Sequence, residues 1–168
     1  MYIRLAEEKD LDRIMEIIAD TVKEMHQNNN FQWNSDYPNR EVFLKDIEDG
    51  VLYVAAGKDD VIAGVAVFNL EKPESYSDVV WKSGENDYVI HRLAVDVKQR
   101  KTGIAKLLVD FGEKMSLEKN LGYMMADTNS KNIKAKKFFE KLGYEYVGKI
   151  KFPGKEDDFY CYEKKLKR

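Results

Sequence analysis

The sequence predicts an α/β domain in which a mixed β-sheet carries helices on both faces. Short apolar runs typical of strands alternate with segments of helical periodicity, and turn residues separate them. In chain order the elements read β-α-α-β-β-β-α-β-α-β-β. The length of 168 residues suits one domain over residues 1–168, and 43% hydrophobic residues are enough for a core.

The strands are identified by apolar runs bounded by turn residues. A polar turn at 57–60 lies between two such runs and predicts a hairpin, and Pro153-Gly154 separates the last two strands. Residues 71–87 are polar and irregular, as expected of a substrate-specific insertion. The predicted strands cover residues 2–5, 51–56, 61–68, 89–95, 123–127, 144–151 and 158–166.

The helices are identified by apolar side chains that recur on one face. The first begins near Lys9 and ends in a polar run at 27–30, and the second covers about 40–48. The third extends from Ile104 to near Lys119. The fourth follows Ser130, which we expect to be its N-cap.

The turn between the strand at 89–95 and the helix at Ile104 has the features of a phosphate-binding site. The first turn of a helix has N–H groups without intrahelical partners and carries the positive end of the dipole. Gly103 lets the backbone bend and lets an anion approach closely, while Arg100, Lys101 and Lys106 add positive charge. An ordinary βα turn with solvated basic residues would show the same pattern.

Charge and cysteine content exclude several classes of protein. A net charge of −2, from 28 basic and 30 acidic residues, argues against a nucleic-acid or membrane-surface protein. The single cysteine, Cys161, excludes an internal disulfide and a cysteine-based zinc site, so we expect no metal and a reducing, cytoplasmic location. No apolar stretch approaches the ~18 residues of a membrane span.

Three motifs resemble the GCN5-related N-acetyltransferase (GNAT) superfamily, over nearly the whole chain from Ile3 to Leu166. They are Ile90-His91-Arg92-Leu93-Ala94-Val95, Arg100-x-x-Gly103-x-Ala105 and Asn132-x-x-Ala135-x-x-Phe138-Phe139-x-x-x-Gly143-Tyr144. The resemblance implies a mostly antiparallel sheet of six to seven strands, flanked by about four helices, with a splayed parallel strand pair. It implies an acyltransferase that moves an acetyl group from acetyl-CoA to a primary amine of a small molecule, peptide or protein, by direct attack in a ternary complex.

The resemblance also implies which residues bind the coenzyme. Backbone amides from Arg100 or Lys101 through Lys106 would hold the pyrophosphate, and Leu93 and Val95 would lie beside the pantetheine arm. An N–H group near Leu93 or Ala94 would polarise the thioester carbonyl. Asn132 would hydrogen-bond along the coenzyme arm, unless it is only a first-turn polar residue. The whole expected set is Leu93, Ala94, Val95, Arg100, Lys101, Thr102, Gly103, Ile104, Ala105, Lys106, Asn132 and Phe139.

Phe139 departs from the family, which normally has a tyrosine at this position to protonate the leaving thiolate. A free thiol titrates at roughly 8.5, so its thiolate is already a fair leaving group near neutral pH. We therefore expect either catalysis without a protein acid, or a substitute hydroxyl from Tyr144 or Tyr160. The same reasoning predicts that Phe139→Tyr raises turnover.

Other candidates concern the acceptor. Three residues at the start of the strand that would hold the thioester could deprotonate an amine: Glu85, Asp87 and His91. Their alternative roles are structural, with the two acids as solvated loop residues and the histidine as a core residue. Trp33, Asp36, Tyr37 and Trp81 are candidates for binding a cationic amine, although aromatic residues of such a loop equally close the edge of a core.

Two further functions compete with the enzyme. The missing tyrosine suits a non-catalytic acyl-CoA sensor or binding module. A generic nucleotide-phosphate site is weaker, because the turn lacks the Gly-Lys-Ser/Thr ending of a P-loop and a three-glycine dinucleotide turn. Dimers are common among related proteins, and the C-terminal strands could supply the edge for a homodimer.

Overall fold

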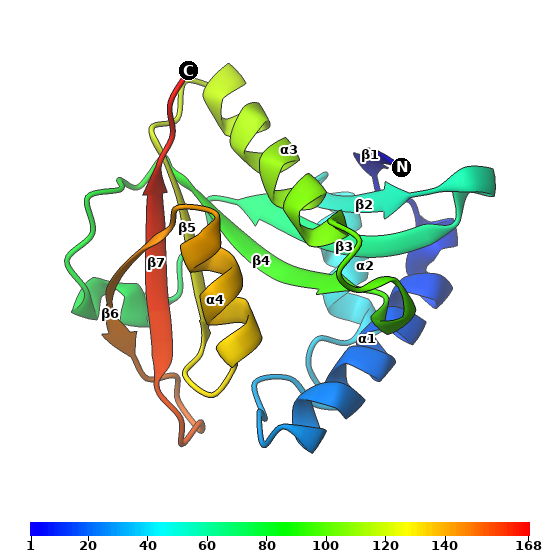
Figure 1. Ribbon diagram of the computed structural model, residues 1–168, viewed down its shortest axis with the longest axis horizontal. Helices are drawn as coiled ribbons and strands as arrows, with labels where there is room; N and C mark the ends of the chain where they lie inside the picture. The colour runs from blue at the N-terminus through cyan, green and yellow to red at the C-terminus, as the bar shows by residue number, and fades with distance from the viewer.

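The computed structural model, which describes residues 1–168, contains one seven-stranded sheet (Figure 1). The strand order is β1-β2-β3-β4-β5-β7-β6, and every neighbouring pair is antiparallel except β4 and β5. The predicted order of elements and the mostly antiparallel sheet with a parallel pair are confirmed. The strands are β1 (Tyr2–Leu5), β2 (Leu52–Ala56), β3 (Ile62–Asn69), β4 (Tyr88–Val95), β5 (Tyr123–Asn129), β6 (Glu145–Ile150) and β7 (Phe159–Lys165).

Helices cover both faces of this sheet, as predicted. Two of them, α3 and α4, pack on one face, while α1 and α2 pack on the other face over β2 and β3. The insertion at 71–87 contributes a short 3₁₀ helix, η3 (Glu74–Asp78), to that second face beside β6. The helices are α1 (Leu11–Gln27), α2 (Arg40–Glu48), α3 (Ile104–Glu118) and α4 (Ile133–Lys141).

The predicted N-cap of α4 is wrong. Asn132, not Ser130, precedes the helix, and its side-chain oxygen accepts a hydrogen bond from the N–H of Ala135 at 3.0 Å. Ser130 instead donates its N–H to the carbonyl of Asp158 in the turn after β5. Asparagine and serine are nearly equal as N-caps, so the composition of the turn could not decide between them.

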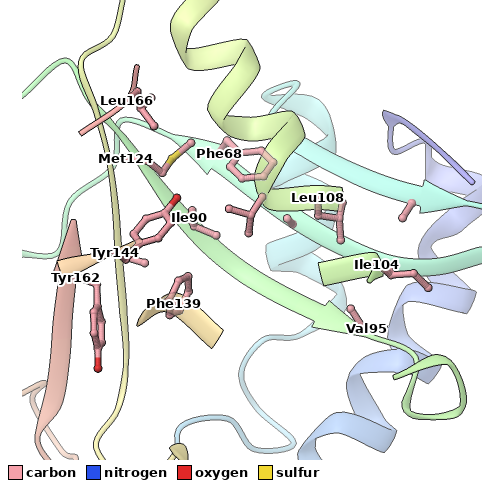
Figure 2. Close-up of a cluster of buried hydrophobic side chains, with 14 of the residues drawn as sticks. Phe68, Ile90, Val95, Ile104, Leu108, Met124, Phe139, Tyr144, Tyr162 and Leu166 are labelled. Carbon is pink, nitrogen blue, oxygen red and sulfur yellow. The ribbon is translucent and has the colours of Figure 1, made fainter. Parts of the chain in front are cut away.

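Two hydrophobic clusters fill most of the space between sheet and helices. The cluster under α3 and α4 contains the buried side chains of Phe68, Ile90, Leu108, Phe139 and Tyr162 (Figure 2). A second cluster joins α1 and α2 to β2 and β3 on the opposite face. The sheet is therefore held between two layers of helices, which fixes the positions of its strand ends.

The parallel strands β4 and β5 separate soon after they begin. They pair only at Tyr88–Met124 and Val89–Met125, and beyond this point they diverge (Figure 1). The separation coincides with a bulge in β4, where Arg92 has a φ of 49° and the register with β3 shifts. A bulge adds one unpaired residue and bends its strand, and this bend turns β4 away from β5.

A buried ion pair holds the bulge in place. The Arg92 guanidinium donates to both carboxylate oxygens of Asp46 in α2, each at 2.7 Å, and also to the hydroxyl of Tyr37 at 3.0 Å. The side chains of Arg92 and Asp46 are only 10% and 8% exposed. A positive φ is costly for a residue with a side chain, and this bidentate pair compensates for the strain.

Close packing of α3 on β3 yields a test of the fold. A Cβ atom on Gly112 would lie 2.4 Å from the Phe68 ring. Alanine favours a helix over glycine by about 1 kcal/mol, but overpacking costs about 1–3 kcal/mol. We expect Gly112→Ala to lower the free energy of unfolding, measured by urea denaturation, and to cost less in a Phe68→Leu background. An unchanged or higher stability would contradict this packing.

Candidate active site

The gap between β4 and β5 exposes two unpaired strand edges that face each other. From Ile90 to Val95, β4 pairs only with β3, and from Ala126 to Asn129, β5 pairs only with β7. Leu93, Ala94 and Val95 therefore lie along an edge to which a strand-like ligand can add main-chain hydrogen bonds, although the Val95 carbonyl already accepts a long one, of 3.4 Å, from Nε of Arg100. In open sheets with parallel strands, ligands bind at such points beyond the strand ends.

At the end of this edge, the turn into α3 presents a run of free amide groups. None of the backbone N–H groups from Arg100 through Lys106 donates a hydrogen bond to another protein atom. Gly103 begins the helix with a φ of 87°, and a Cβ atom there would meet nothing within 4 Å. Seven consecutive unpaired N–H groups at a helix N-terminus, with open space above the glycine, are an arrangement suited to an anion, and residues 100–106 are called the anion-binding turn below for this candidate role.

The basic side chains of this turn are differently engaged. Arg100 pairs with Glu24 of α1 at 2.5 Å, and Lys106 pairs with Asp110 one turn further along α3 at 2.5 Å. Lys101 and Thr102 are exposed, and Lys101 has a positive φ of 64°. Ala105 is partly buried and Ile104 is buried in the core, which anchors the helix beneath the turn.

Two further residues expected to bind the coenzyme are the N-cap of α4 and a residue within this helix. The Asn132 side-chain oxygen caps the helix, so in the free protein its amide group remains the part open to a ligand. Phe139 is buried, and its ring centroid lies 5.4 Å from that of Tyr144 and 5.9 Å from that of Tyr162. Tyr144 is also buried and donates its hydroxyl hydrogen to Glu113 at 2.9 Å; burial raises its pKa well above the usual value.

On the opposite face, the unpaired end of β5 carries a carboxylate that the sequence alone did not single out. Asp127 accepts a hydrogen bond from the hydroxyl of Tyr76, in η3, at 2.5 Å. Desolvation raises the pKa of Asp127 to about 6, although the Tyr76 hydrogen bond opposes the shift. A carboxylate with such a pKa is suited to accept a proton near neutral pH. The signal in the sequence was an acidic residue at the end of an otherwise apolar strand.

The catalytic candidates that precede the bulge each have contacts of their own. Asp87 is buried and accepts from the N–H groups of Gly84, Gly122 and Tyr123, so it ties two turns together. Glu85 is exposed on the same loop. His91 contacts the Glu71 carbonyl through Nε2 at 2.9 Å, so this nitrogen carries a proton. Desolvation, then the charge of Arg92, lower the pKa of His91 to about 4.

The structure does not bring together the four residues expected to bind the acceptor. Trp33 is 5% exposed and belongs to the core under α1. Asp36 and Tyr37 are exposed on the loop before α2, and Tyr37 contacts Arg92. Trp81 stacks on Tyr76 with ring centroids 4.8 Å apart, and thereby covers the residue that holds Asp127.

The loop before α2 reaches across the gap to β5. The side-chain oxygen of Gln32 accepts from the N–H of Asn129 at 3.2 Å, and the Phe31 carbonyl accepts from Lys155 in the β6–β7 turn at 3.1 Å. This bridge places the loop beside the unpaired end of β5. A groove of about 860 Å³ is lined by α1 and by Asn34, Ser35 and Pro38 of this loop, and it shares no residue with the anion-binding turn. A smaller cavity of about 310 Å³ includes Thr102, Gly103 and Ile104.

Comparison with known proteins identifies the family. The model of the acetyltransferase (GNAT) family matches residues 14–144, and the chain belongs to this family. The match includes the anion-binding turn, the diverging strands and α4. No curated protein sequence matches the chain.

Solved structures show the same fold over almost the whole chain. A GNAT-family acetyltransferase from Streptococcus agalactiae 2603 is 27% identical, with a TM-score of 0.84 over 99% of this chain and 95% of that one. A putative acetyltransferase from Staphylococcus aureus Mu50 is 29% identical, with a TM-score of 0.77 over 99% of this chain and all of that one. A ribosomal-protein-alanine N-acetyltransferase from Brucella melitensis is 21% identical, with a TM-score of 0.72 over 99% of this chain and all of that one.

No helix combines the length and the apolar character needed to cross a bilayer. No group of three or more histidine, cysteine or acidic side chains is arranged to hold a metal ion.

A pair of glycines tests the anion-binding turn. Gly103 and Gly50 both have positive φ angles, of 87° and 67°, and a Cβ atom on either would meet nothing within 4 Å. Alanine at either position should cost about 1 kcal/mol of stability through backbone strain. Only Gly103→Ala should also weaken binding of coenzyme A, by about tenfold, because its methyl group occupies the approach of the anion. Titration calorimetry measures both affinities, and equal affinities would argue against the turn as the phosphate site.

Proposed function

We propose that the protein transfers an acetyl group from acetyl-CoA to a primary amine of a small molecule or of a peptide or protein, by direct attack in a ternary complex. The observation that carries this proposal is the run of unpaired N–H groups from Arg100 through Lys106, continuous with the unpaired edge of β4. A coenzyme with a pyrophosphate at one end and an amide-containing arm at the other needs these two surfaces in this order.

The turn and the strand would bind different parts of the coenzyme. The N–H groups at 100–106 suit the pyrophosphate, and the edge at Leu93 and Val95 suits the amides of the pantetheine arm. An N–H group at Leu93 or Ala94 would donate to the thioester carbonyl and stabilise the oxyanion that forms on attack. Asn132, at the head of α4, would approach the arm from the other side of the gap.

Asp127 is the residue that we infer removes a proton from the attacking amine. A primary amine is largely protonated at neutral pH and is not nucleophilic in that form. The pKa of Asp127, about 6, leaves it mostly ionised at pH 7 yet more basic than an ordinary carboxylate. Asp127 lies on the unpaired part of β5, on the face of the sheet opposite α3 and α4. The acceptor amine would therefore enter the gap from that face, away from the coenzyme-binding turn.

Direct transfer is favoured over a cysteine-linked intermediate. Cys161 is the only cysteine; it is buried, and desolvation, then the charge of Asp127, raise its pKa to about 12. The thiolate, not the thiol, is the nucleophilic form, and almost none is present at neutral pH. The state of Cys161 therefore supports direct attack of the amine on the thioester.

A non-catalytic acyl-CoA sensor is the alternative, because Phe139 supplies no proton to a leaving thiolate. A panel of amines with acetyl-CoA, followed by thiol release, separates the two functions. Amine-dependent release supports the enzyme. Binding of acetyl-CoA with slow release that no amine accelerates would establish the sensor, and absence of binding would overturn both.

Asp127→Asn tests the proposed base. We expect kcat/KM to fall about 10²- to 10⁴-fold, and we expect the rise of wild-type kcat/KM with pH, centred near the Asp127 pKa of about 6, to disappear. A folded-state pKa above the unfolded value means that stability decreases as pH rises through about 4 to 6, so the substitution should not lower the melting temperature at pH 7. A pH profile unchanged by the substitution would eliminate Asp127 as the base.

Tyr76→Phe is the matching conservative variant. It keeps the aromatic packing on Trp81 but removes the hydrogen bond that favours the charged form of Asp127. The acidic limb of the pH profile should therefore move to higher pH, with the rate at high pH nearly retained. A shift to lower pH, or none, would show that this hydrogen bond does not tune the carboxylate.

A further inference from the structure

The cations around the anion-binding turn already hold an anion supplied by the protein. The carboxylate of Glu24, in the last two turns of α1, accepts from Nη1 of Arg100 at 2.5 Å. The same oxygen, Oε1, lies 3.4 Å from Nζ of Lys134 in the first turn of α4. Glu24 thus connects α1 to the turn before α3 and to the head of α4. Arg100 and Lys134 are 76 and 110 residues away from it in the sequence.

We propose that Glu24 is an internal counter-anion that sets the affinity of this site for phosphate. Coenzyme phosphate must displace the carboxylate before it pairs with Arg100 and Lys134. This inference rests on the proposed function, because coenzyme A is the anion that the turn would bind. It adds to that function a residue that weakens coenzyme binding, and it assigns Lys134 to the phosphate site.

The contact is exchangeable because water reaches all three groups. The side chains of Glu24 and Arg100 are 30% and 31% exposed, and Lys134 is 77% exposed. Ion pairs with this exposure contribute little to stability, since solvent screens them and ordering the side chains costs entropy. A phosphate, which carries more charge and more acceptor oxygens than a carboxylate, competes well for the same donors.

The turn does not depend on Glu24 for its shape. Asp96 is buried, caps the N–H of Lys98 at 3.0 Å and pairs with Arg13 of α1 at 2.5 Å. Thr102 adds a hydrogen bond to the Gln99 carbonyl at 2.6 Å. These contacts hold the turn against α1 independently, so replacing the Glu24 carboxylate removes the competing charge and leaves the seven N–H groups in place.

The test compares coenzyme A binding by the wild type and by Glu24→Gln, using titration calorimetry. Loss of the competing carboxylate should tighten binding by roughly two- to fivefold, the range that corresponds to an exposed ion pair. Glu118→Gln is the matched control: it removes the same charge from an exposed pair with Lys114, at the opposite end of α3, and its affinity should equal that of the wild type.

Salt dependence supplies a readout that a purely structural role would not change. In the wild type, binding exchanges one ion pair for another, whereas in Glu24→Gln it forms new pairs, so the variant's affinity should fall more steeply with ionic strength. Equal or weaker binding by Glu24→Gln, with wild-type binding intact, would overturn the role of Glu24 alone. Absence of coenzyme A binding in all three proteins would overturn the proposed function, and this inference with it.

Discussion

The separation of β4 from β5 depends on one strained residue and the ion pair that holds it. Arg92 adopts a positive φ within a strand, and its guanidinium is fixed by Asp46 in a nearly dry environment. Two unpaired charges there would be costly, but two matched hydrogen bonds at 2.7 Å offset the desolvation. The bend at this residue leaves the backbone edges of both strands unpaired. The candidate site is the space thereby opened, with the head of α3 at its end.

The arrangement of elements was predictable because each one has a strong local pattern. Apolar alternation, helical periodicity and glycine turns gave strand and helix positions within one or two residues for most elements. The position of the turn before α3 was predictable for the same reason, since Gly103 and the apolar positions of α3 lie in one continuous stretch, while its binding of an anion stays a prediction. The cap of α4 was predicted wrongly, because Ser130 and Asn132 are both good caps and only the structure shows that the Asn132 side chain accepts from the N–H of Ala135.

Features that depend on distant contacts could not be predicted. The pKa of Asp127 depends on burial under η3 and on Tyr76, 51 residues away. The ion pair between Arg100 and Glu24 forms only once α1 and α3 are packed on the same sheet. No spacing within the sequence indicates this pair. The role of Trp33 also depended on distant contacts. The sequence of its loop was compatible with a core or a substrate-facing position, and only the packed structure shows its side chain within the core.

The position of β7 has a consequence for how the chain is made. β7 lies between β5 and β6, both of which precede it in the sequence, so neither strand pairs with the other. During synthesis the edges of β5 and β6 that pair with β7 emerge first and remain open until residues 159–165 leave the ribosome. Open edges are templates for pairing between chains, so aggregation is a hazard for the nascent protein in this interval. Insertion of one strand then closes both edges together.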